Sequence, residues 1–227
     1  MPATASTCWT VIQAAAAGSK EDGTQFVQRY APLVRAYLAA RWRQSPYAGE
    51  LDDAVQEVFV DCFRPDGVLA RADAACAGGF RAFLYGVVRL VALRFESRHA
   101  RQRERQASSD ADLGAIVADD ESLSEVFDRA WANALVREAA ELQEKQARQN
   151  GEAALLRVEL LRLRFHHGLP IRDIAERWQK ETAWVHHEYA RAREEFKSAL
   201  TEVVAFHQPG TAADVQRTCA NLIASWD

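Results

Sequence analysis

Apolar residues recur every three or four positions along most of the chain, the spacing that places them on one face of an α-helix. The stripe from Phe26 to Leu38 is one case, and similar stripes follow over residues 51–62 and 80–95, with polar side chains mostly on the opposite faces. No stretch alternates convincingly between apolar and polar residues, which is the period of a half-buried β-strand. The pattern therefore predicts an all-α protein.

The helical pattern divides into two regions. Residues 107–121 are acidic and contain no Lys or Arg, which is typical of a linker between domains. We expect one helical domain over residues 6–106 and a second over 122–206. The apolar face of a further helix within 207–227 predicts a C-terminal extension that packs on the second domain.

Two amphipathic helices lie close together within residues 170–198. The first carries its apolar residues from Ile171 to Trp178, and the second carries them from Val185 to Phe196. A break at residues 179–181 separates the two helices. Two such helices joined by a turn of three or four residues predict a helix-turn-helix.

Charge restricts where a nucleic acid could bind. The 227 residues carry a formal net charge of −4, which argues against coating of nucleic acid by bulk attraction. Residues 79–106 differ, because seven Arg against two Glu give +5 there. The second helix of the helix-turn-helix is weakly charged, with three basic and four acidic residues over 181–197 and a net charge of −1. Any basic binding surface is therefore local.

The sequence predicts no metal, cofactor or disulfide. The four cysteines (Cys8, Cys62, Cys76 and Cys219) show no paired spacing, which favours a reduced cytoplasm. The His166–His167 and His186–His187 pairs do not suit a metal, because adjacent side chains diverge on a helix. The N-terminus lacks the features of a signal peptide, and no apolar run is long enough to span a bilayer, so we expect no membrane association.

Two motifs together resemble a bacterial RNA polymerase sigma factor of the extracytoplasmic-function class, in the sigma-seventy family. The first combines DDAVQEVFVDCF (52–63) with FRAFLYGVVRLVALRFESR (80–98), and the second is GLPIRDIAERWQKETAWVHHEYARAR (168–193). The resemblance covers about residues 6–200. Two motifs in this order and at this separation are more specific than a helix-turn-helix alone.

The resemblance implies binding and no catalysis. The partners would be core RNA polymerase, through the clamp helices of its largest subunit and its flap region, and promoter DNA. An anti-sigma factor or another regulator is a further possible partner. The core-polymerase contacts would be Asp52, Asp53, Gln56 and Glu57. The contacts to the minus-ten element would be Arg81, Tyr85, Arg89, Arg94, Arg98 and Arg101. The contacts to the minus-thirty-five element would be Thr182, Trp184, His186, His187, Arg191 and Arg193.

The resemblance also implies that residues 64–79 form a specificity loop, because in the family the loop before the minus-ten helix helps to form the pocket for a flipped base. The chain departs from the family at several positions. Leu90 follows Arg89 where the family commonly has Asn, and Gln179 replaces the usual Gly of the turn. His186 and Glu188 stand where Lys and Arg are common.

Two other functions remain open at this stage. The first is a self-sufficient helix-turn-helix regulator that binds operator DNA as a dimer. The second is an α-helical hydrolase that uses His166, His167 and Glu residues to hold a metal.

Overall fold

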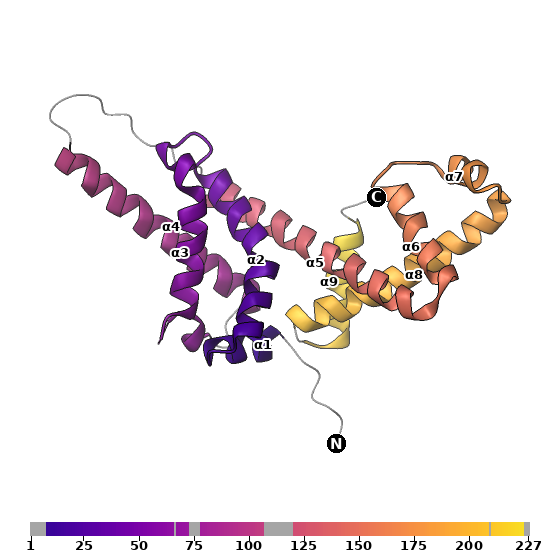
Figure 1. Ribbon diagram of the computed structural model, residues 1–227, viewed down its shortest axis with the longest axis horizontal. Coiled ribbons are helices and arrows are strands. Elements are labelled where there is room, and N and C mark those ends of the chain that lie inside the picture. The colour runs from indigo at the N-terminus through magenta and orange to yellow at the C-terminus, as the bar shows by residue number, and fades with distance from the viewer. Residues whose placement is uncertain (1–7, 66, 73–77, 107–119, 209, 225–227) are drawn as a thin grey trace, which may run out of the picture. The chain divides into compact units, whose positions relative to one another are not determined.

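The computed structural model describes residues 8–65, 67–72, 78–106, 120–208 and 210–224, with the backbone alone described in 102–106 and at 120. This part of the chain holds nine α-helices, two short 3-10 helices and no β-strand, which confirms the predicted all-α class (Figure 1). None of these helices is both long enough and apolar enough to cross a membrane. The elements in order are α1 (Cys8–Ala16), α2 (Lys20–Arg41), η1 (Pro46–Glu50), α3 (Leu51–Phe63), η2 (Leu69–Arg71), α4 (Gly79–Gln106), α5 (Asp120–Asn150), α6 (Glu152–Phe165), α7 (Ile171–Trp178), α8 (Thr182–His207) and α9 (Ala212–Ala224).

The chain divides into two compact units, Met1–Ala134 and Leu135–Asp227, named unit 1 and unit 2 below. The division falls inside α5, whereas the sequence places it at residues 107–121. Residues 107–119 lie outside the described part of the chain. The first turns of α5 belong to unit 1 because Phe127 and Trp131 are buried against its aromatic residues.

Aromatic side chains fill the core of unit 1. Phe26 and Tyr30 of α2 contact Phe80 at the start of α4, with ring centroids 6.0 and 5.0 Å apart. Tyr30 also stacks on Trp131 of α5, with the ring planes 7° from parallel. Helix α3 packs against both α2 and α4 (Figure 1). This packing fixes the positions of the outer surfaces of α3 and α4 relative to each other.

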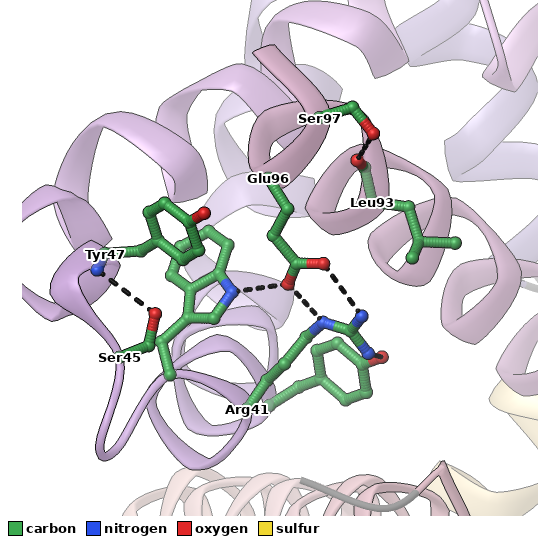
Figure 2. A network of polar contacts seen from close by, with 8 residues as sticks. Arg41, Ser45, Tyr47, Leu93, Glu96 and Ser97 are labelled. Atoms are coloured by element: carbon green, nitrogen blue, oxygen red, sulfur yellow. Dashed lines mark hydrogen bonds and ion pairs between the residues drawn. The ribbon is translucent and has the colours of Figure 1, made fainter. Parts of the chain in front are cut away.

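A polar network joins the end of α2 to α4 (Figure 2). Arg41 is only 4% exposed, although the apolar stripe of its helix suggests that it lies off the buried face. Its Nε donates to Glu96 Oε1 at 2.7 Å, and the Trp42 indole Nε1 donates to the same oxygen at 2.7 Å. Burial by itself lowers the Arg41 pKa, but the hydrogen bond and charge of Glu96 outweigh this effect and raise it. A charge buried in this way is stable because it is fully paired.

The core of unit 2 is built from α6, α7 and α8. Leu160 and Leu163 of α6 pack against Ile174 and Ala175 of α7 and Val185 of α8. Gly151 separates α5 from α6 with a φ of +91°, a conformation that glycine adopts without strain.

The second half of α8 extends this core to the C-terminus. His207 is buried there and lies 2.9 Å from Glu138 of α5. Helix α9 packs on α8 and buries Val215 and Cys219, as its apolar face predicts. Its first turn is capped, because the Asp214 N–H donates to Thr211 Oγ1 and the Thr211 N–H donates to the Asp214 carboxylate, both at 3.3 Å.

Candidate nucleic-acid interface

The predicted polymerase contacts lie along the outer face of α3. Asp52 and Asp53 stand in its first turn, where carboxylates are favoured by the positive end of the helix dipole. Asp52 is 80% exposed and pairs with Arg35 of α2. Asp53 and Gln56 are also exposed. The structure thus presents three of the four predicted side chains on one accessible acidic surface.

The fourth residue, Glu57, is three-quarters buried because it faces α4. Its carboxylate pairs with Arg98, which is one of the predicted minus-ten contacts. One turn further along α3, Asp61 pairs with Arg94 of α4 and with Arg64, the latter at 2.8 Å. The acidic surface of α3 and the arginines of α4 are therefore adjoining surfaces that share ion pairs.

Three of the predicted minus-ten arginines line one groove between α3 and α4. Arg94, Arg98 and Arg101 are all exposed on the α4 side of this groove. Arg89 is exposed one turn earlier on the same helix. The side chains of Arg103 and Arg105 lie outside the described residues. The structure thus brings three of the six predicted minus-ten residues together in one groove.

Arg81 and Tyr85 are placed away from this groove. Arg81 donates from its Nε to Asp128 of α5 at 2.5 Å. Tyr85 is half-buried, and its ring packs edge-on against Tyr37 and Phe127 with centroids 5.7 and 5.1 Å away. Tyr85 therefore contributes to the packing of unit 1 in this conformation.

Two apolar side chains are exposed on α4 beside the arginines. Leu90 is 53% exposed at the position where the resembling family commonly has Asn, and Leu93 is 38% exposed one turn later. Exposed leucines on a basic surface are available to contact bases or sugars, since apolar side chains meet the thymine methyl group in direct readout. Leu90 itself offers only apolar contacts on this surface.

In unit 2, helices α7 and α8 are joined by a three-residue turn at 179–181. Gln179 adopts the left-handed conformation, with φ 53° and ψ 43°, and is the one non-glycine residue of the described chain with positive φ. Its N–H donates to the Glu176 carbonyl and the Lys180 N–H to the Ala175 carbonyl, at 3.1 and 3.0 Å, which is the Schellman pattern of helix termination. Gln179 thus forms the turn with the backbone strain that a non-glycine residue has in this conformation.

Helix α8 exposes all six of the predicted minus-thirty-five residues. The side chains of its first turn include Thr182 and Trp184, and the Lys180 ammonium lies 5.6 Å from the centre of the Trp184 ring. The opposite face holds Val185 and Ala192, which are buried in unit 2. The exposed set is Thr182, Trp184, His186, His187, Arg191 and Arg193.

The charge of the exposed α8 face differs from the sequence count. Glu188 is only 7% exposed, and it accepts a hydrogen bond from Arg157 of α6 at 3.2 Å. Glu195 accepts from the same guanidinium at 2.8 Å. The hydrogen bond to Glu195 is the largest cause of a raised Arg157 pKa. One guanidinium thus pairs with both carboxylates, so residues 181–197 together with Arg157 carry a net charge of 0, whereas residues 181–197 alone carry −1.

The spacing of residues along α8 could have predicted that Glu188 is buried. It lies three residues after Val185 and four before Ala192, so it falls on the buried side of α8. Buried carboxylates need a cationic partner. No signal identified Arg157 as that partner, because the two residues are 31 positions apart.

The described residues hold no group of three or more His, Cys, Asp or Glu side chains placed to bind a metal. His166 and His167 lie exposed at the end of α6 with their rings nearly perpendicular, at 85°. The Cys62 thiol is buried, and burial, together with the charge of Asp61, raises its pKa to about 12. Cys76 lies outside the described residues.

No known protein-family model matches this chain, and no curated protein matches it either.

Proposed function

We propose that this protein is a sigma factor that binds core RNA polymerase and directs promoter recognition and transcription initiation in the cytoplasm. One observation carries the proposal. Each of the two helical units presents the exposed face that the resembling motifs require: the α3–α4 surface in unit 1 and the outer face of α8 in unit 2. The function is binding alone, and the polymerase supplies the chemistry.

The acidic surface of α3 is proposed to dock on the clamp helices of the largest polymerase subunit. Asp52, Asp53 and Gln56 are accessible for this contact. Charge complementarity between such a surface and a basic partner fixes the docking register and accelerates association. Exposed carboxylates contribute little to the stability of the free protein, so their role is better explained by a partner.

The groove arginines are proposed to contact the DNA backbone at the minus-ten element. Arg94, Arg98 and Arg101 stand along one side of α4. Neutralisation of phosphates by arginine releases counterions and makes affinity fall with salt. Leu90 and Leu93 lie on the same helix and would meet bases or sugars. This assigns affinity to the arginines and part of the specificity to the leucines.

Helix α8 is proposed to enter the major groove at the minus-thirty-five element. Its exposed polar side chains can orient the helix, but its net charge, which is 0 with Arg157 included, is too small to anchor unit 2 on DNA by phosphate neutralisation. Affinity at this element then depends on the polymerase, whose flap region would hold unit 2. A dimeric operator-binding regulator would need stronger binding by each copy alone.

Size-exclusion chromatography with core polymerase tests the proposal. The unaltered chain should co-elute with polymerase. Reversal of charge in Asp52→Lys/Asp53→Lys should weaken the complex, because it removes two carboxylates from the docking surface. A matched control is Glu141→Lys/Glu144→Lys, which reverses two exposed carboxylates of α5 in unit 2 that also pair with arginines.

Circular dichroism should first show that both double variants keep their helices. Equal co-elution of the two variants would remove the α3 assignment. If the unaltered chain never joins polymerase yet shifts a defined duplex by itself, the dimeric regulator replaces the sigma factor as the better proposal.

A further inference from the structure

Helices α3 and α4 enclose an open groove of about 540 Å³. Its lining contains four guanidinium groups and two carboxylates, which leaves a local charge of +2. The sequence predicted three of these arginines as minus-ten contacts. The fourth, Arg64, was expected only as the first residue of the specificity loop, and it follows α3 on the other side of the groove. The lining residues are Glu57, Asp61, Arg64, Leu93, Arg94, Ser97, Arg98 and Arg101.

Asp61 is the residue that organises the arginines. It is 4% exposed, and each of its carboxylate oxygens forms an ion pair with a different guanidinium. Oδ1 lies 2.8 Å from an Arg64 nitrogen, and Oδ2 pairs with an Arg94 nitrogen from the opposite wall. One buried carboxylate thus holds two arginines that come from two different elements.

The ion pairs leave most of the arginine donors unused. Each guanidinium has five N–H donors in a planar fork, and each ion pair with Asp61 or Glu57 engages one nitrogen. Arg64, Arg94 and Arg98 remain 59%, 44% and 58% exposed. The carboxylates therefore orient the guanidinium groups while their outer edges still face the groove.

The turn that follows α3 fixes the backbone position of Arg64. The Gly67 N–H donates to the Arg64 carbonyl at 2.7 Å, and the Val68 N–H donates to the Asp61 carbonyl at 3.2 Å. A Cβ atom at Gly67 would lie 2.5 Å from the Arg64 carbonyl oxygen, so only glycine fits this turn without a shift. Arg64 is consequently held at the mouth of the groove by backbone structure.

We propose that this groove is a phosphate-binding site in which Arg64 acts together with Arg94, Arg98 and Arg101, and in which Asp61 is a positioning residue for Arg64 and Arg94. Several oriented guanidinium groups match the oxygens of a phosphate, and a net charge of +2 favours a polyanion. Leu93 adds an apolar wall against which a sugar can pack. The source of the phosphate is the promoter strand if the proposed function holds, or else a free phosphate compound.

The test has two arms and one matched control. Arg64→Ala removes the new contact, and Arg43→Ala removes an exposed arginine of unit 1 that is not part of the groove lining. In the first arm, the affinity of the polymerase-bound chain for promoter DNA is measured against salt concentration. Arg64→Ala should lower the slope of log affinity against log salt by about 0.7–0.9, the loss of one phosphate contact, and Arg43→Ala should leave it unchanged.

In the second arm, inorganic tripolyphosphate is titrated into the full chain alone by calorimetry. Arg64→Ala should weaken this binding at least about tenfold, the effect of losing one hydrogen bond to a charged group. A reduced salt slope supports the DNA strand as the phosphate source. Weakened tripolyphosphate binding with an unchanged salt slope supports a free phosphate compound. If neither quantity changes, the site assignment is overturned.

Asp61→Asn tests the positioning role separately. It keeps the shape of the side chain and adds one unit of positive charge to the groove. A purely electrostatic effect would strengthen tripolyphosphate binding, whereas loss of orientation weakens it. We expect weaker binding, and stronger binding would remove the positioning role of Asp61. Failure of the chain to join polymerase would count against the proposed function and leave the tripolyphosphate arm as the test of the groove.

Discussion

The turn between α7 and α8 offers a test of the local structure that presents α8. Gln179 occupies the left-handed region in the Schellman turn, where the resembling family commonly has glycine. Its side chain is exposed, so its replacement by glycine removes no buried packing. We expect Gln179→Gly to stabilise unit 2 without changing the position of α8.

The size of this effect follows from two opposing contributions. The left-handed conformation costs a non-glycine residue about 1–2 kcal/mol. Glycine loses more backbone entropy on folding, which costs about 0.5–1 kcal/mol. The difference is a net stabilisation of about 1 kcal/mol. Unit 2 spans 93 residues (227 − 134), so its Tm should rise by about 4–8 °C if it melts separately, or by about 2–4 °C if the whole chain melts as one.

Differential scanning calorimetry of the full chain measures this shift. Gln179→Ala is one control, because alanine retains the left-handed penalty and should give no comparable gain. Lys180→Gly is the second control. Lys180 does not have a positive φ, so glycine there adds only its entropy cost and should lower the stability. If Gln179→Gly is no more stable than Gln179→Ala, the strain assigned to this turn does not exist.

Three further predictions concern the remaining contacts. Glu188→Ala should lower the free energy of unfolding by about 1–3 kcal/mol in urea, because Arg157 stays buried with one carboxylate fewer; a loss below about 0.5 kcal/mol would argue against that pair. Replacing both Arg98 and Arg101 by Ala should flatten the salt dependence of promoter binding by roughly one to two units of slope, and an unchanged slope would exclude phosphate contact there. Hydrogen bonds from the Thr211 hydroxyl and N–H hold the pKa of Asp214 below its ordinary value of 3.8, so its contribution to stability is present above that pH and is lost as the pH falls through the lowered pKa. Circular dichroism between pH 5 and pH 2 should therefore show a smaller acid-induced loss of helix in Asp214→Asn, and identical acid profiles would contradict this cap.

The all-α class and the outer faces of the helices could be predicted from the sequence because both depend on local periodicity. The stripe of α8 placed Val185 and Ala192 inside, which leaves Trp184, His187 and Arg191 outside. The same reasoning predicted the exposed acidic residues at the start of α3. These features need no knowledge of what each helix packs against.

The ion pairs could not be predicted because their partners are distant in sequence. Arg41 and Glu96 are 55 residues apart, and nothing in the local pattern indicates that they meet. The acidic face of α3 was predicted, but its sharing of ion pairs with α4 depends on helix packing. The burial of Phe127 and Trp131 in unit 1 is likewise a tertiary effect that local periodicity does not encode.

Start-site mapping tests the central proposal most directly. Core RNA polymerase is incubated with genomic DNA fragments, with and without the purified chain, and the 5′ ends of the transcripts are sequenced. Addition of the chain should produce a new, defined set of start sites that share sequence near minus-ten and minus-thirty-five. Start sites that are the same in both reactions, combined with tight binding of a specific duplex by the chain without polymerase, would contradict the account.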